Sequence, residues 1–221
     1  MTLLLALKLS HLLLFVYWLG ADLGTFYAAR FVANEKLTPD ARATAAKIML
    51  GIDLTPRVCM PLTLATGVHL AWLIGALPVA GLWVAVSWLV CLNWLAMVLV
   101  LHHGAAAAWA VRLAAFDFRF RVLLVALLLA WTVNALAGAG PVTASWLSVK
   151  IACYALTIVC GLMIRVHLRP FGPAFGALMR SGATAEVNAA IASSIARCVP
   201  FVWAIWGLLV VCAAAGLRVL A

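Results

Sequence analysis

The chain has 221 residues, of which 68% are hydrophobic and only 10% are charged. A soluble domain of this length carries roughly a quarter charged residues, so the composition excludes a soluble globular protein and predicts an integral membrane protein. In a soluble protein, the formal net charge of +9 would favour nucleic acid as a partner. Here the basic residues stand between apolar runs, which makes them signals of membrane topology, and we expect no nucleic-acid partner.

Six apolar stretches are long enough to cross a bilayer, which takes about 20 residues. They lie near residues 7–31, 48–76, 82–103, 119–138, 145–168 and 196–219. We therefore predict an all-α fold, an integral membrane bundle of about six transmembrane helices that forms a single domain over residues 1–221 within the lipid bilayer. Between the stretches, segment 32–47 is polar and contains Thr38-Pro39-Asp40, which resembles a helix start. Segment 104–118 is typical of an interfacial amphipathic piece.

The distribution of Lys and Arg predicts the orientation, because basic residues are enriched in cytoplasmic loops. One side of the predicted bundle collects Arg30, Lys36, Arg42, Lys47, Arg57, Arg112, Arg119, Arg121, Arg165, Arg169, Arg180 and Arg197. The other side has Lys8, Lys150 and Arg218. This asymmetry makes the first side cytoplasmic. Both termini then lie on the non-cytoplasmic side, and the loops 77–81 and 139–144 are short outer turns.

The histidines fall into two layers, and each is a candidate functional residue because ionisable side chains inside a bilayer are costly. His11 and His69 have similar depth near the outer leaflet, and Lys150 has comparable depth. The second layer, near the cytoplasmic side, contains His102, His103 and His167. The six cysteines include no C-x-x-C pair, and we interpret them as buried, inert thiols.

The outer layer is typical of a haem site. Two histidines on facing helices can hold a b-type haem, since each neutral imidazole offers one ring nitrogen to the iron. His11 and His69 satisfy the requirement for two helices at matched depth, so we predict them as metal ligands of one haem b. The inner layer is a candidate for a second haem. The alternative is that each histidine hydrogen-bonds a neighbouring helix or lies at the membrane interface.

Helical phase gives the first predicted helix a polar face. At about 100° per residue, His11, Trp18 and Asp22 lie on the same side. We expect Trp18 to line the cofactor site, and Asp22 to relay protons or to pair with Arg57 of the second helix. A purely structural ion pair is an equally open interpretation of Asp22.

The fifth predicted helix places Lys150 and Tyr154 on one face. We expect Tyr154 to line the cofactor site, and we expect Lys150 to be an alternative to His69 as the second axial ligand. The competing interpretation is that Lys150 extends its ammonium group to the outer interface.

Several short motifs resemble the CopD and HemJ-like membrane proteins, of which the latter are haem-b-containing bacterial protoporphyrinogen oxidases. The motifs are Ser10-His11-Leu12 with Trp18-Leu19-Gly20, Arg30-Phe31-Val32, the stretch from Ile48 to Gly67 through Pro56, and Trp146-Leu147-Ser148-Val149-Lys150. The resemblance implies a multi-pass protein of the bacterial cytoplasmic membrane and carries roles in haem binding and activity to His11 and Lys150 only. The chain departs from the family pattern in two ways, because residues 78–140 look inserted and His69 has no counterpart.

Three functional hypotheses follow. The first is a haem-b membrane redox protein that exchanges electrons with quinone or a partner protein, with Lys150 and Asp22 as candidate catalytic residues; its narrow version is an oxidoreductase acting on protoporphyrinogen. The second is a CopD-like copper transporter using the same histidines with Cys59 and Met60. The third is a structural or assembly subunit of a larger membrane complex or a homo-oligomer.

Overall fold

The computed structural model describes residues 2–104, 107–142 and 144–217. Within these residues the chain forms seven helices and no strand. They are α1 (Leu3–Ala33), α2 (Pro39–Leu73), α3 (Gly81–His103), α4 (Ala110–Leu136), α5 (Ser145–His167), α6 (Phe171–Ser181) and α7 (Ala185–Gly216). Five helical runs in the described part are long and apolar enough to cross a membrane: α1, α2, α3, the run Ser145–Ser181 that joins α5 and α6, and α7. The prediction of an all-α, multi-pass membrane protein is confirmed.

The remaining predicted span, 119–138, overlaps α4 as far as its last residue, Leu136, and α4 is not among those five runs. The first half of α4 carries Arg112, Asp117, Arg119 and Arg121, so that only its second half is continuously apolar. The amphipathic piece expected at 104–118 and the apolar stretch after it are therefore largely one continuous helix.

Two helices begin well before the apolar stretches that predicted them, because threonine caps extend them. Thr38 Oγ1 accepts a hydrogen bond from the backbone N–H of Ala41, and α2 starts with Pro39 at its first position. Thr184 Oγ1 accepts from the N–H of Val187 and starts α7 in the same way. The end of the last predicted span, with Arg218, lies outside the described residues.

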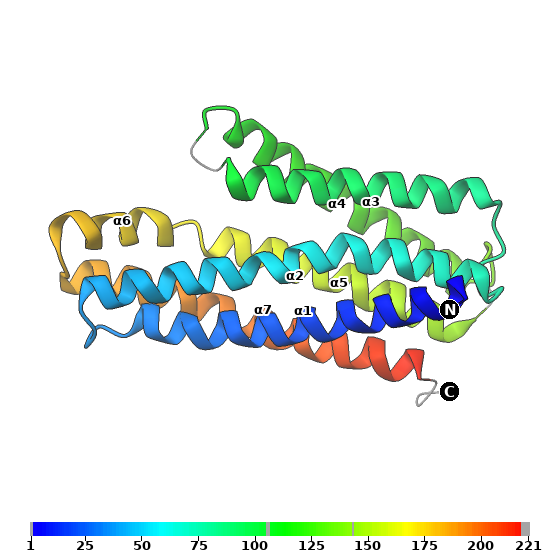
Figure 1. The fold of residues 1–221 in the computed structure, drawn as a ribbon, viewed down its shortest axis with the longest axis horizontal. Coiled ribbons are helices and arrows are strands. Elements are labelled where there is room, and N and C mark those ends of the chain that lie inside the picture. Colours follow the sequence, from blue (N-terminus) through cyan, green and yellow to red (C-terminus); the bar gives the residue numbers. More distant parts are fainter. Residues whose placement is uncertain (1, 105–106, 143, 218–221) are drawn as a thin grey trace.

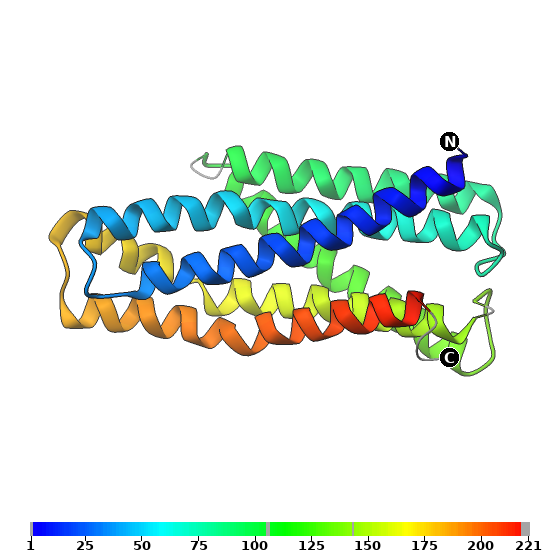
Figure 2. The same cartoon turned by 60° about the horizontal axis from the view of Figure 1, so that its bottom comes forward.

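Six helices form a flattened ring in chain order, with α1 packed on α2, α2 on α3, α3 on α4, α4 on α5, α5 on α7, and α7 back on α1. The α1–α2 and α5–α7 contacts are the most extensive. Figures 1 and 2 show that the start of α1 and the end of α7 lie at the same end of the bundle, which we call the terminal end. At the other end, the distal end, α1, α2 and α7 extend beyond α3, and α6 covers α7 and α2 (Figure 1).

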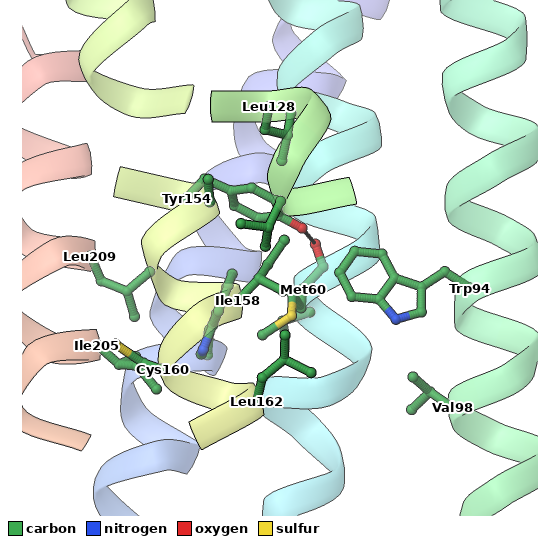
Figure 3. Close-up of a cluster of buried hydrophobic side chains, with 14 residues drawn as sticks. Met60, Trp94, Val98, Leu128, Tyr154, Ile158, Cys160, Leu162, Ile205 and Leu209 are labelled. Atoms are coloured by element: carbon green, nitrogen blue, oxygen red, sulfur yellow. Dashed lines mark hydrogen bonds between the residues drawn. The ribbon is translucent and has the colours of Figure 1, made fainter. Parts of the chain in front are cut away.

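The main core fills the ring and draws buried side chains from all six of its helices. The Tyr154 hydroxyl of α5 donates a 2.8 Å hydrogen bond across the ring to the Met60 carbonyl of α2 (Figure 3). Trp94 reaches the same region from α3 (Figure 3). Trp18 of α1 is only 1% exposed and meets Tyr154 edge to face, with 6.2 Å between ring centroids. Large aromatic rings thus fill the centre, beneath the terminal end.

A second core joins α1, α2, α6 and α7 at the distal end. Arg42 of α2 is fully buried beside it. Its Nε donates to the Val32 carbonyl at 2.9 Å, and its Nη1 donates to Oδ1 of Asn188 at 2.7 Å. Because Val32 lies in the last turn of α1, the guanidinium places positive charge at the negative end of that helix dipole and ties together the distal ends of three helices.

Candidate functional site

The best-defined polar contact at the terminal end joins His11 of α1 to Thr66 of α2, with 2.8 Å between Nδ1 and Oγ1. The Thr66 hydroxyl lies 2.8 Å from the Leu62 carbonyl and can only donate to it. A hydroxyl has one proton, so Thr66 donates either to the Leu62 carbonyl or to Nδ1 of His11. When Thr66 donates to Leu62, the Nδ1–H of the neutral imidazole donates to Thr66, and Nε2 keeps a free lone pair.

Gly67 makes room for this imidazole. A Cβ atom added at Gly67 would lie 3.2 Å from Cε1 of His11, closer than an ordinary carbon contact. Any larger residue would push the ring away from α2. Adjacent positions of α2 thus have two roles, since Thr66 fixes the orientation of the ring and Gly67 accommodates its edge.

Lys150 of α5 lies at the same end as His11, because α5 begins there at Ser145 and α1 begins there at Leu3 (Figure 1). A Cβ atom added at Gly216 of α7 would lie 2.9 Å from the Lys150 ammonium nitrogen, so the side chain runs against the bare backbone of that glycine. The Sγ of Cys212 on α7 lies 3.7 Å from the backbone carbonyl of Lys150. The fold therefore places two of the predicted site residues, His11 and Lys150, at the same end of the bundle on the first and fifth helices.

Trp18 and Tyr154 lie beneath this pair rather than beside open space. They contact each other in the main core, and the only polar atom of the Tyr154 side chain is used by Met60. Both side chains form the floor of the terminal-end site.

His69 faces a different neighbour. The indole nitrogen of Trp88 on α3 donates to its Nδ1 at 3.3 Å, and the ring also contacts Trp72. The described contacts of His11 are with α2. Those of His69 are with Trp88 of α3 and with Trp72, a residue of α2 that lies beside the start of α3. The structure thus gives the two histidines similar depth without directing them at each other.

Asp22 has a partner that the sequence did not suggest. Its Oδ2 accepts a 2.8 Å hydrogen bond from Nε1 of Trp206 on α7. Arg57, the expected partner, instead forms an ion pair with Asp53 one helical turn earlier on α2. The described contacts of Asp22 therefore connect α1 to α7 and not to α2.

Sequence reasoning missed a fully buried carboxylate. Asp117 of α4 is 0% exposed, and its two carboxylate oxygens accept from Arg121 at 3.0 Å and from Arg165 of α5 at 2.7 Å. Arg121 also lies over the ring of Trp94 at 5.2 Å from its centroid, a cation–π contact. The i, i+4 spacing of Asp117 and Arg121 was the available signal, whereas the link to Arg165 depends on how α4 packs on α5.

The inner histidines are distributed over two places. His102 and His103 contact each other at the end of α3, with ring centroids 5.2 Å apart. His167 stacks on Phe201 of α7 at 5.4 Å. In the part of the chain that the structure describes, no three His, Cys, Asp or Glu side chains gather into a group that could hold a metal ion.

Comparison with known proteins found no matching family model, no matching curated protein and no matching solved structure.

Proposed function

We propose that the protein is a haem-b-binding membrane redox protein with its cofactor at the terminal end and His11 as an axial ligand. The observation that carries the proposal is the 2.8 Å hydrogen bond between His11 Nδ1 and Thr66 Oγ1, in which we infer that Nδ1–H donates because Thr66 donates to Leu62. A ligating histidine commonly donates its second ring N–H to a fixed acceptor, which sets the tautomer and makes the other nitrogen a better ligand. Nε2 of His11 makes no hydrogen bond within the described residues and is the nitrogen offered to iron.

Lys150 supports the same site as a cation at the same end of the bundle as His11. A buried ammonium group can pair with a haem propionate or, when neutral, serve as the second ligand. We keep His11 and Lys150 in the proposal and leave His69 out. Its Nδ1 accepts from Trp88, which places the proton of the neutral ring on Nε2 and leaves no free lone pair for iron. When bound, the haem would supply one-electron chemistry, with quinone or a partner protein as the electron acceptor.

The resemblance to HemJ-like proteins adds the narrower proposal, oxidation of protoporphyrinogen. The two residues to which it assigns roles, His11 and Lys150, lie near the starts of α1 and α5 at the terminal end. The inserted segment corresponds to α3 and α4, which pack on α2 and α5 while the α1–α2 and α5–α7 contacts stay extensive. The insertion therefore leaves α1, with His11, packed on α2, and α5, with Lys150, packed on α7.

Copper transport is less well supported by the described contacts. A copper relay needs several soft or imidazole ligands around one ion, and no such group forms among the described residues. Cys59 and Met60 are buried in the main core instead.

For orientation, we propose that the distal end faces the bacterial cytoplasm. Basic residues in its helix ends and connections include Arg30, Lys36, Arg42, Lys47, Arg165, Arg169 and Arg180. Lys8 and Lys150 lie at the terminal end, which would face outward in the inner membrane.

The test is the amount of haem retained by purified variants. His11→Ala should lose haem, whereas His69→Ala, which removes a histidine of similar depth, should retain it. Full haem retention by His11→Ala would overturn the assignment of the ligand. Loss of haem in both variants would instead support a site in which His11 and His69 both bind the iron.

A further inference from the structure

A pocket between α4 and α5 at the distal end is not used by the proposed function. It has a volume of about 390 Å³ and is open to the surroundings of the protein. Its lining consists of Val111, Ala114, Ala115, Phe118 and Arg119 from α4, with Arg165 and Arg169 from the end of α5 and the turn after it. Three guanidinium groups therefore share one pocket with an apolar wall.

The charge in this pocket is not balanced by nearby carboxylates. Asp117 is the acidic partner of Arg165, but it also binds Arg121 and is fully buried beneath the surface. Neither Arg119 nor Arg169 forms an ion pair within the described ranges of the chain. The pocket thus presents an excess of positive charge, and it does so with arginines, whose planar donor groups match the geometry of phosphate oxygens.

Asp117 also fixes the position of this charge. Its carboxylate holds the Arg165 guanidinium at 2.7 Å, and the side chain of Arg165 remains 36% exposed. One guanidinium is therefore held in place by a buried partner while part of it stays available to a ligand. Such pre-organisation lowers the entropy cost of binding.

The apolar wall indicates what the rest of the ligand is. Val111, Ala114, Ala115 and Phe118 follow i, i+3, i+4, i+7 spacing on one face of α4. Val111 and the nearby Trp109 and Phe116 are exposed large apolar side chains, which a membrane protein presents to lipid. Tryptophan is enriched at the depth of the headgroups. The pocket lies where the spanning helix α5 ends, so its arginines and its apolar wall meet at the boundary between headgroups and acyl chains.

We propose that this pocket binds the phosphate group of an anionic phospholipid, with Arg119, Arg165 and Arg169 on the phosphate and the α4 face beside the acyl chain. Basic pockets between membrane helices are known to select anionic headgroups in this way. The proposal does not depend on haem binding at the terminal end. A zwitterionic lipid carries the same phosphate but adds a cationic group, which the three arginines disfavour.

The experiment is native mass spectrometry of the full chain in detergent, with added phosphatidylglycerol or with phosphatidylcholine of the same acyl chains. The test variant is Arg119→Gln combined with Arg169→Gln, which keeps Arg165 and its buried partner intact. The matched control is Arg112→Gln combined with Arg180→Gln, because both of these arginines are exposed and outside the pocket lining. It removes the same net charge from the same end of the protein.

The wild type should retain phosphatidylglycerol in preference to phosphatidylcholine. The test variant should bind phosphatidylglycerol about tenfold more weakly or worse, since each lost hydrogen bond between charged groups is worth about that factor, and the control should change little. Equal retention of the two lipids, or equal losses in test and control variants, would overturn the proposal. A third arm uses inorganic phosphate as competitor: displacement of the lipid at equimolar phosphate would show that the apolar wall contributes nothing and would refute a lipid ligand.

Discussion

Replacing Thr66 by Val tests the hydrogen bond on which the terminal-end site depends. Valine keeps the branched shape of threonine but cannot accept from His11 Nδ1–H, which now lies 2.8 Å from Thr66 Oγ1. The Thr66 side chain is only 4% exposed, so water cannot easily take its place. The imidazole N–H would be left without a partner in a half-buried position.

Loss of one partner from a buried hydrogen bond costs about 1–3 kcal/mol. His11 itself is half-buried, so we expect the free energy of unfolding to fall by about 1–2 kcal/mol, at the lower end of that range. Haem affinity should fall further, by about 10- to 100-fold, as for other losses of a residue that orients a metal ligand. Unfolding is measured by SDS titration in mixed micelles and affinity by haem titration of the same preparations.

Thr132→Val is the matched control. The Thr132 hydroxyl is also buried and donates to the carbonyl four residues earlier, Leu128, at 2.9 Å, but no histidine depends on it. Its replacement should change neither stability nor haem affinity by a measurable amount. The reasoning is refuted if Thr66→Val binds haem as tightly as the wild type, or if Thr132→Val weakens haem binding as much as Thr66→Val does.

Three further substitutions test other parts of the structure. Asp117→Asn should lower the free energy of unfolding by about 3 kcal/mol, because it leaves two guanidiniums without an anion; a loss below about 1 kcal/mol in SDS titration would contradict the buried ion pairs. Gly67→Ala should lower the free energy of unfolding by at most about 2 kcal/mol, since about 1 kcal/mol of helix propensity opposes about 1–3 kcal/mol of crowding against His11. It should also weaken haem binding, and unchanged binding in haem titration would contradict the close approach. Trp206→Phe removes the donor to Asp22 and should cost about 1–2 kcal/mol, and no loss in the same SDS titration would show that this hydrogen bond is not formed.

The membrane fold could be predicted from the sequence because hydrophobic runs of helical length leave few alternatives in a bilayer. Hydrophobicity alone did not predict the starts of α2 and α7, because Thr38 and Thr184 extend these helices through polar residues by capping. The motif Thr38-Pro39-Asp40 did predict the start of α2, and the structure confirms it. In α4, charged residues in the first half interrupt the apolar pattern, so hydrophobicity did not predict that the helix continues through them.

In the candidate site, too, one feature could be predicted from the sequence and another could not. Sequence reasoning gave His11 and His69 the same depth, and depth follows directly from position along a helix. The direction in which each side chain points does not follow from its position along the helix, because it depends on how α2 is rotated about its axis in the bundle. Thr66 and His69 differ by about 60° on the helix wheel, which is enough for one to contact α1 while the other contacts Trp88 of α3.

The most direct test of the central claim is the absorption spectrum of the wild-type protein purified in detergent, recorded as isolated and after reduction with dithionite. We expect a Soret band and, on reduction, a sharpened α band typical of b-type haem, both absent from His11→Ala prepared in parallel. A featureless spectrum from folded wild-type protein that does not change when haem is added would contradict the account.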